Sequence, residues 1–152
     1  MTSEDLTQRD EETESYRQFV ISEEHAASNG AALPLMIANR LGYMDRQALE
    51  EEPTADSDVT PYIDLIVASS SNDADYLLPD TPLKEALFRI ILANGNRPMD
   101  AEEISRILNE RWAMSAYPRN LSPHVINRLL ENSANYCIVP VEEPEDEEGA
   151  GE

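Results

Sequence analysis

The chain has 152 residues, 31 of them acidic and 11 basic, and its formal net charge at pH 7 is −20. That length is enough for one ordinary domain, or for a smaller domain with long tails. A protein this acidic is repelled overall by the phosphates of nucleic acids, because binding there requires Lys and Arg side chains that displace counterions. The charge therefore excludes a generally basic nucleic-acid-binding protein. Any DNA contact must come from a local face of the chain, and we expect it to be weak.

The sequence carries no signal for export, membrane insertion or cysteine chemistry. Residues 1–15 have neither the basic start nor the apolar stretch of a signal peptide. No apolar run approaches the roughly 20 residues of a membrane-spanning helix. The single cysteine, Cys137, excludes an internal disulfide and a cysteine-based zinc site, and its apolar neighbours predict a small buried side chain. We therefore expect a cytoplasmic protein with no membrane contact.

Charge is distributed unevenly along the chain. Residues 1–79 contain 17 acidic and 4 basic residues, a net charge of −13, whereas residues 80–140 contain 7 of each. Residues 141–152 add 7 acidic residues and no basic one. From this distribution we predict four parts, which are a disordered acidic tail (1–15), an acidic and partly helical N-terminal region (16–79), a neutral folded module (80–141) and a second disordered acidic tail (142–152).

The N-terminal region contains short helical patterns. Apolar residues over 16–27 fit a short helix. A second helix is predicted over 35–41, with Gly42 just after its end, and it could resume over 44–52. Over 60–68 the pair Thr-Pro at the start favours a helix, whereas the β-branched content favours a strand. Both alternatives stay open there, with the helix slightly favoured.

The neutral module contains the clearest helix signals of the chain. Its first helix is predicted to start with Thr81 as its cap and Pro82 at its first position, and to end before Gly95. Its second helix begins with Asp100 and Glu103 at the spacing of a capping box, in which each side chain bonds the other residue's backbone N–H. These local signals predict two helices joined by a short loop.

A third helix and a strand complete the module. The helix is predicted to begin at Ser122 as its cap, with Pro123 at its first position. A strand follows over 136–139, and Pro140 would confine it to the edge of a sheet. Three helices followed by a strand give the order of a helix-turn-helix or winged-helix module. The predicted fold class is mainly α, an α+β fold with a minimal sheet and acidic flanking regions.

Two segments carry this order of elements, LKEALFRIILANGNRPMDAEEISRIL and SPHVINRLLENSANYCIV, within residues 81–141. In these segments the module resembles the HARE-HTH winged-helix family, which includes the N-terminal domain of the δ subunit of bacterial RNA polymerase. The resemblance implies a winged-helix fold and a role in transcription, at RNA polymerase or DNA. A wing needs a β-hairpin, yet the chain becomes acidic after Val141. The wing is therefore either missing, or its partner strand is short and lies near residues 97–99.

The third helix of such a module would lie in the major groove and present its exposed side chains to the bases. The candidate contact residues on this helix and just before it are Arg119, Asn120, His124, Asn127 and Arg128. Arg and Asn can make paired hydrogen bonds to guanine and adenine, but two arginines are few beside the phosphate contacts that specific binders make. The same residues fit a solvated polar face or a protein contact, and these alternatives stay open. If the wing is missing, Met114, Tyr117 and Tyr136 could form an exposed patch for a partner.

No residue pattern predicts catalysis, a metal site or a cofactor. The two histidines, His25 and His124, lie in segments of different character, and no serine or cysteine motif marks a nucleophile. The acidic run at 56–58 begins like a calcium loop, but Pro61 and Val67 stand where that loop needs Gly and Glu. We therefore expect a non-enzymatic protein with no small-molecule substrate.

Two functional hypotheses follow. In the first, the chain is a transcription-associated accessory protein whose winged-helix-like module binds RNA polymerase or DNA, modulated by its acidic flanks. In the second, it is a protein–protein adaptor or assembly subunit without nucleic-acid binding. The second rests on the small basic footprint and on apolar patches in residues 16–49 and 61–78.

Overall fold

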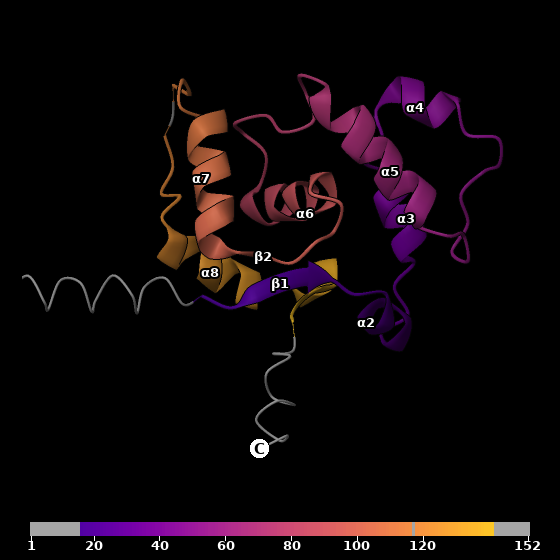
Figure 1. Cartoon of the computed structure of the whole chain (residues 1–152), viewed down its shortest axis with the longest axis horizontal. Helices are drawn as coiled ribbons and strands as arrows, with labels where there is room; N and C mark the ends of the chain where they lie inside the picture. Colours follow the sequence, from indigo (N-terminus) through magenta and orange to yellow (C-terminus); the bar gives the residue numbers. More distant parts are fainter. Residues whose placement is uncertain (1–15, 117, 142–152) are drawn as a thin grey trace, which may run out of the picture.

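The computed structural model describes residues 16–116 and 118–141, so both predicted disordered tails lie outside the described residues. This part of the chain is mostly helical with a small three-stranded antiparallel sheet, which confirms the predicted fold class (Figure 1). In the described part of the chain, no helix is both long and apolar enough to cross a membrane.

The module follows the predicted order of elements. Helix α6 (Leu83–Ala93) leads into the short strand β2 (Met99–Asp100), helix α7 (Ala101–Arg111) and helix α8 (Pro123–Glu131), and a 3-10 turn (Ala134–Tyr136) precedes strand β3 (Ile138–Pro140).

The predicted caps of α7 and α8 are confirmed. The Asp100 side chain accepts a hydrogen bond from the Glu103 backbone, and the Glu103 carboxylate accepts one from the Asp100 backbone, both at 3.0 Å. Ser122 accepts from the Val125 backbone at the start of α8. The prediction for Thr81 is wrong, because α6 starts at Leu83 and no side chain caps it.

The end of α6 is closed by a turn that also contacts the sheet. The backbone N–H of Gly95 bonds to the carbonyl of Leu92, and that of Asn96 bonds to the carbonyl of Ile91, which is the Schellman arrangement. Gly95 and Asn96 both have positive φ values, 74° and 56°. This conformation suits Gly and Asn better than other residues, so the sequence Asn-Gly-Asn fixes where the helix stops.

The sheet is built around a strand from the N-terminal region. Strand β1 (Gln18–Ile21) is the middle strand, and it pairs antiparallel with β2 on one side and β3 on the other. The predicted helix over 16–27 is therefore wrong in its first half, and only α2 (Glu23–Ser28) is helical. Phe19 and Ile21 are buried while Gln18 is exposed, the alternation of a strand with one covered face.

This sheet also settles where the strand partners of the module lie. β3 pairs with β1, matching Phe19 with Pro140 and Ile21 with Ile138, and Val141 donates a backbone hydrogen bond to Gln18. β2 lies at the predicted position near residues 97–99, but it pairs with β1 rather than with β3. Pro140 is at a sheet edge, as predicted, because β3 has a neighbour on one side only.

Three more helices lie in the N-terminal region. They are α3 (Leu33–Ala38), α4 (Tyr43–Gln47) and α5 (Thr60–Ala68), and a 3-10 turn (Ser70–Asn72) follows α5. The favoured helix over 60–68 is confirmed. The helix predicted over 44–52 ends at Gln47, and Gly42 caps the start of α4 instead of following α3 directly.

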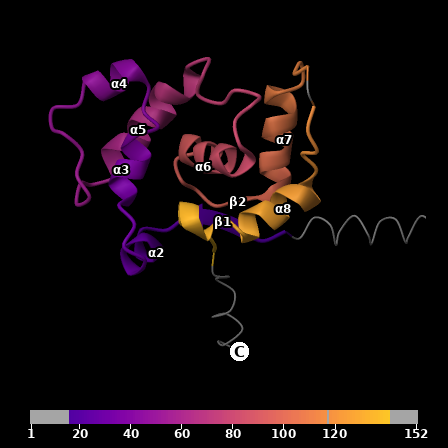
Figure 2. The ribbon, with the colours of Figure 1, turned by 180° about the vertical axis from the view of Figure 1, so that it is seen from behind.

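All these elements share one hydrophobic core. Helix α6 lies in the middle, with α5 on one side and α7 on the other (Figures 1 and 2). The sheet and α8 lie below α6 in both views. Ile37 and Ile66 of the N-terminal helices are fully buried, as are Leu87 and Ile91 of α6. Residues 16–79 therefore pack on the module and complete both its sheet and its core.

Candidate functional site

The outward face of α8 carries three of the five predicted contact residues. Arg128 and His124 are exposed and neighbours on this helix, with the guanidinium nitrogen Nη2 3.0 Å from the imidazole Nε2. One turn away, the Asn127 amide donates to the Glu131 carboxylate at 3.3 Å. The polar groups that could read bases are thus paired with each other along the helix, in the i, i+4 spacing of helix-surface pairs.

Asn127 is less available than its neighbours. Its side-chain oxygen is buried and accepts no hydrogen bond within the described residues. The amide nitrogen is held by Glu131, whose negative charge would face a DNA phosphate unfavourably. α8 therefore presents one arginine next to one glutamate, with no net positive charge when His124 is neutral.

Arg119 lies elsewhere and has a structural role. Its guanidinium donates to the carbonyls of Pro79 at 2.9 Å and Thr81 at 2.6 Å. It also stacks 4.8 Å above the ring of Trp112, a cation–π contact. These contacts tie the segment before α6 to the loop between α7 and α8, so Arg119 is not free to contact DNA.

Asn120 and the residues of the predicted apolar patch differ in their exposure. Asn120 is exposed, and its side chain accepts from the Ser122 backbone just before α8. Met114 is 94% exposed, whereas Tyr117 lies outside the described residues. Tyr136 is partly buried, with its ring 5.3 Å from that of Phe88. The predicted patch of these aromatic and apolar residues therefore does not include Tyr136.

A network around Glu85 was not found from the sequence. The Glu85 carboxylate accepts hydrogen bonds from Arg40 at 2.7 and 2.9 Å and from Arg89 at 2.7 Å. The Tyr136 hydroxyl donates to it at 3.1 Å. Arg89 and Tyr76 also bond each other's backbone carbonyls at 2.8 and 2.7 Å. One carboxylate thus joins the N-terminal region, α6 and the turn before β3.

The surroundings of Glu85 shift its ionisation strongly. Burial alone would raise the pKa of this carboxyl, but the hydrogen bonds and charges of Arg40 and Arg89 lower the pKa to about 2. Burial also raises the pKa of the Tyr76 and Tyr136 hydroxyls, and the Glu85 charge adds to this effect. A carboxylate held between two arginines is a structural ion pair, because both of its oxygens are already occupied. The sequence indicates only one part of this network, the pair Glu85 and Arg89, which are four residues apart on one helix.

The two histidines lie apart from each other. His25 is on α2, where its Nε2 is 3.2 Å from the Ala134 carbonyl oxygen, and His124 is on α8. Among the described residues no group of three or more His, Cys, Asp and Glu side chains could hold a metal ion. Cys137 is buried, and burial raises the pKa of its thiol, so its thiolate is disfavoured.

No protein-family model, curated protein or solved structure matches this chain.

Proposed function

We propose that this chain is a non-enzymatic accessory protein of transcription, whose winged-helix-like module binds a protein partner such as RNA polymerase. The observation that carries the proposal is the order α6, β2, α7, α8, β3, completed by β1 into a three-stranded sheet. This order supports the resemblance to the HARE-HTH family, whose members include a domain of a polymerase subunit. The role in transcription is proposed from this analogy of fold.

The state of α8 supports a protein partner over DNA. A base-reading helix needs free donors at its exposed face and several cations for the phosphates. Here Arg128 is paired with His124, Asn127 is paired with Glu131, and Arg119 is held by backbone carbonyls. Reading a base would first require breaking these contacts. The acidic regions on both sides of the module would repel DNA further.

The non-enzymatic part of the proposal is supported by the partners of three reactive side chains. His25 and His124 bond separate neighbours, and Cys137 is a buried thiol. A general base or nucleophile must lie within hydrogen-bond reach of its partner group.

A titration with a fluorescent DNA duplex tests whether α8 binds DNA only weakly, as the proposal expects. With one arginine and at most one charged histidine on α8, the slope of log K against log salt should be about −1 to −2. A protein with 6–10 phosphate contacts would give a slope of roughly −5 to −9. Measured binding with a steep slope, abolished by Arg128→Ala and unaffected by Arg106→Ala on the exposed face of α7, would instead assign DNA reading to α8.

Recovery of partners from cells tests the protein part. A photo-reactive amino acid placed at position 128 should crosslink to a polymerase subunit, and the same group at position 106 serves as the matched exposed control. Reproducible crosslinks to proteins unrelated to transcription would favour the second candidate, an adaptor or assembly subunit. That candidate is supported by the exposed apolar side chains of α4, which are remote from α8.

A further inference from the structure

Helix α4 is held to the molecule by polar contacts. It has five residues, and none of them is buried. The Asp45 carboxylate accepts hydrogen bonds from the hydroxyls of Ser69 and Ser70, and Ser70 also accepts from the Gly42 backbone at 2.9 Å. Arg46 donates to the Ala38 carbonyl at 3.2 Å. The inward face of this helix is therefore polar.

The outward face of α4 is apolar. Tyr43 is 74% exposed and Met44 is 76% exposed, and they are adjacent in the sequence. A surface helix normally turns its apolar side chains to the core and its polar ones to water. In α4 this polarity is reversed, and hydrogen bonds to Asp45 hold the reversed orientation in place. Tyr is enriched at protein interfaces, and Met adapts its flexible side chain to a partner surface.

The segment after α4 adds negative charge next to the C-terminal end of this helix. A hollow of about 440 Å³ lies next to the helix, lined by Arg46, Gln47, Leu49, Glu50, Glu51, Glu52 and Pro53. Within the described ranges the only ion pairs are those of Glu85 with Arg40 and Arg89. The three glutamates of the hollow are exposed and take part in neither ion pair. Arg46 also lines the hollow, but its guanidinium donates to the Ala38 carbonyl, and one cation leaves the four charged side chains with a net charge of −2.

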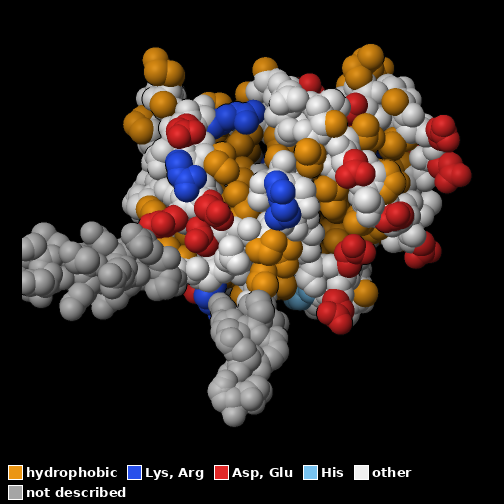
Figure 3. Space-filling view, in the orientation of Figure 1, with side chains coloured by type: hydrophobic (Ala, Val, Ile, Leu, Met, Phe, Trp, Pro, Cys, Tyr) orange, Lys and Arg blue, Asp and Glu red, His pale blue; other side chains and the backbone are white. Residues whose placement is uncertain are grey.

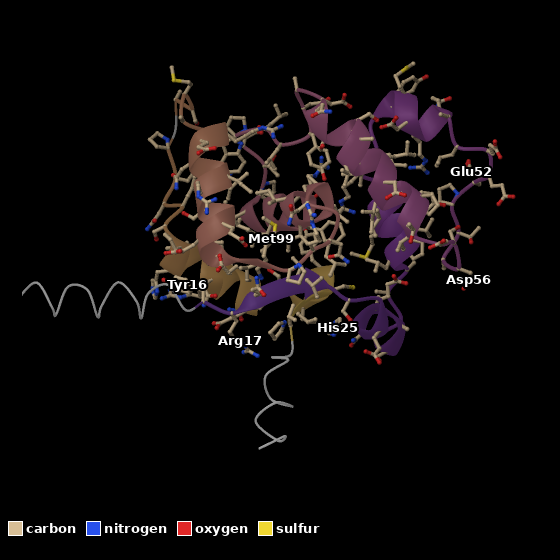
Figure 4. All side chains as sticks on the ribbon, viewed as in Figure 1. Tyr16, Arg17, His25, Glu52, Asp56 and Met99 are labelled. Atoms are coloured by element: carbon tan, nitrogen blue, oxygen red, sulfur yellow. The ribbon has the colours of Figure 1, made fainter. Side chains whose placement is uncertain are left out.

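The figures place this charge at one edge of the molecule. Glu52 and Asp56 lie on the loop between α4 and α5, at the outer edge opposite α7 (Figure 4). Acidic side chains gather along that same edge in the space-filling view (Figure 3). Residues 41–79 contain nine acidic residues and one basic residue, a net charge of −8.

We propose that the α4 surface, formed by Tyr43, Met44 and the hollow of Glu50–Glu52, docks a Lys- and Arg-rich segment of a partner protein that carries an apolar anchor residue. The proposal rests on the protein-binding function proposed above and names the chemistry of the partner. The anchor would cover Tyr43 and Met44, and basic side chains would enter the hollow. A second copy of this chain, an anionic membrane and a nucleic acid are all repelled by the same charge.

A designed peptide tests the chemistry of the surface. The probe is a fluorescent helical peptide of Lys and Leu only, with Leu at helical spacing on one face, and binding to the full chain is followed by anisotropy. The double variant Tyr43→Ser, Met44→Ser should weaken binding by about tenfold or more, as for a central contact of an interface. Met114→Ser removes an apolar side chain that is 94% exposed elsewhere and should leave affinity unchanged.

A charge-matched pair of variants separates this site from general attraction to an acidic protein. Replacing Glu50, Glu51 and Glu52 by Gln removes three negative charges, and replacing Glu142, Glu143 and Glu145 by Gln removes the same number. The first variant should lose several-fold more affinity than the second. Equal losses from both triple variants, or an unchanged affinity in the Tyr43 and Met44 double variant, would overturn the proposal.

Crosslinking in cells distinguishes this proposal from the function on which it rests. A photo-reactive amino acid at position 43 should crosslink to a partner peptide that mass spectrometry identifies as Lys- and Arg-rich. Crosslinks at position 128 to transcription proteins, without any at position 43, would overturn the α4 site and leave the proposed function standing. Crosslinks at position 43 to a basic segment of a protein outside transcription would support the site and contradict the proposed function. Crosslinks at neither position would contradict both.

Discussion

Replacing Glu85 by Gln should destabilise the fold, and the loss should depend on pH. The side chains of Glu85 and Arg40 are only 15% and 16% exposed, so Gln would leave two arginines without their counter-charge in a poorly hydrated place. Breaking such a pair by changing one partner costs roughly 3–5 kcal/mol when it is fully buried. For this partly exposed network we expect a loss of about 3 kcal/mol at pH 7.

The lowered pKa of Glu85 reflects the same contacts with Arg40 and Arg89 and leads to a similar magnitude. The pKa is lowered from 4.5 to about 2, and at about 1.4 kcal/mol per pKa unit this difference corresponds to at most about 3 kcal/mol of stability, which solvent screening of the partly exposed carboxylate reduces. Because the pKa in the folded protein is below that in the unfolded chain, the contribution is complete above pH 4.5. It is lost as the pH falls from there through about 2, and below that pH both states are protonated.

Urea unfolding followed by the fluorescence of Trp112, the single tryptophan, measures this contribution. The difference in unfolding free energy between the wild type and Glu85→Gln should be greatest at neutral pH and should shrink steadily below pH 4.5. Other carboxylates titrate in both proteins, so the difference cancels their effect. Glu110→Gln, at an exposed position of α7, removes the same charge and should change stability by less than about 0.5 kcal/mol. If this difference in unfolding free energy stayed constant with pH, the assignment of an ionised Glu85 carboxylate with a lowered pKa would be refuted.

Three further predictions concern the strand and loop contacts. Phe19→Ala should cost about 3–5 kcal/mol in urea unfolding, because this fully buried ring belongs to the middle strand. Asn96→Ala should cost about 2 kcal/mol, since it removes two 2.9 Å hydrogen bonds to the backbone of Ile21, and Asn96→Gly should cost less because Gly keeps the positive φ. Arg119→Ala should lower stability by about 1–2 kcal/mol and alter Trp112 fluorescence without changing DNA affinity in the same titration.

The helices of the module could be predicted because their signals are local. A capping box needs only residues three apart, and a proline at the first helical position needs only its neighbour. The Asp100–Glu103 box and the Ser122 cap were therefore readable, and both are present. The Thr81 prediction failed for a related reason, because the cap position depends on where the helix starts and Pro82 takes that place instead.

The strand β1 could not be read from its own residues. The four residues QFVI are too few to separate strand from helix by periodicity, and the alanine-rich segment after them favours a helix. Their partners, β2 and β3, lie far along the chain. Pairing between distant segments leaves little local signal, so the residues of the middle strand were predicted to be part of a helix.

The candidate site was also only partly predictable. The sequence places His124 and Arg128 on one exposed helix face, and the structure confirms that they lie together. Sequence alone did not show that Arg119 bonds two backbone carbonyls near α6, because those contacts come from a loop about forty positions away in the chain. It also gave no reason to expect the reversed polarity of α4, since hydrogen bonds from Ser69 and Ser70 determine it.

The two candidate surfaces lie on opposite sides of the core, and this separates their tests. In both ribbon views α4 and α8 are at diagonally opposite corners, with α6 between them (Figures 1 and 2). Substitutions at sites this far apart and without shared partners normally have additive effects. Changes at Tyr43 should therefore leave partner contacts of Arg128 intact. Glu85→Gln should weaken binding at both surfaces, because the Glu85 network joins the N-terminal helices to α6 and to the turn before β3.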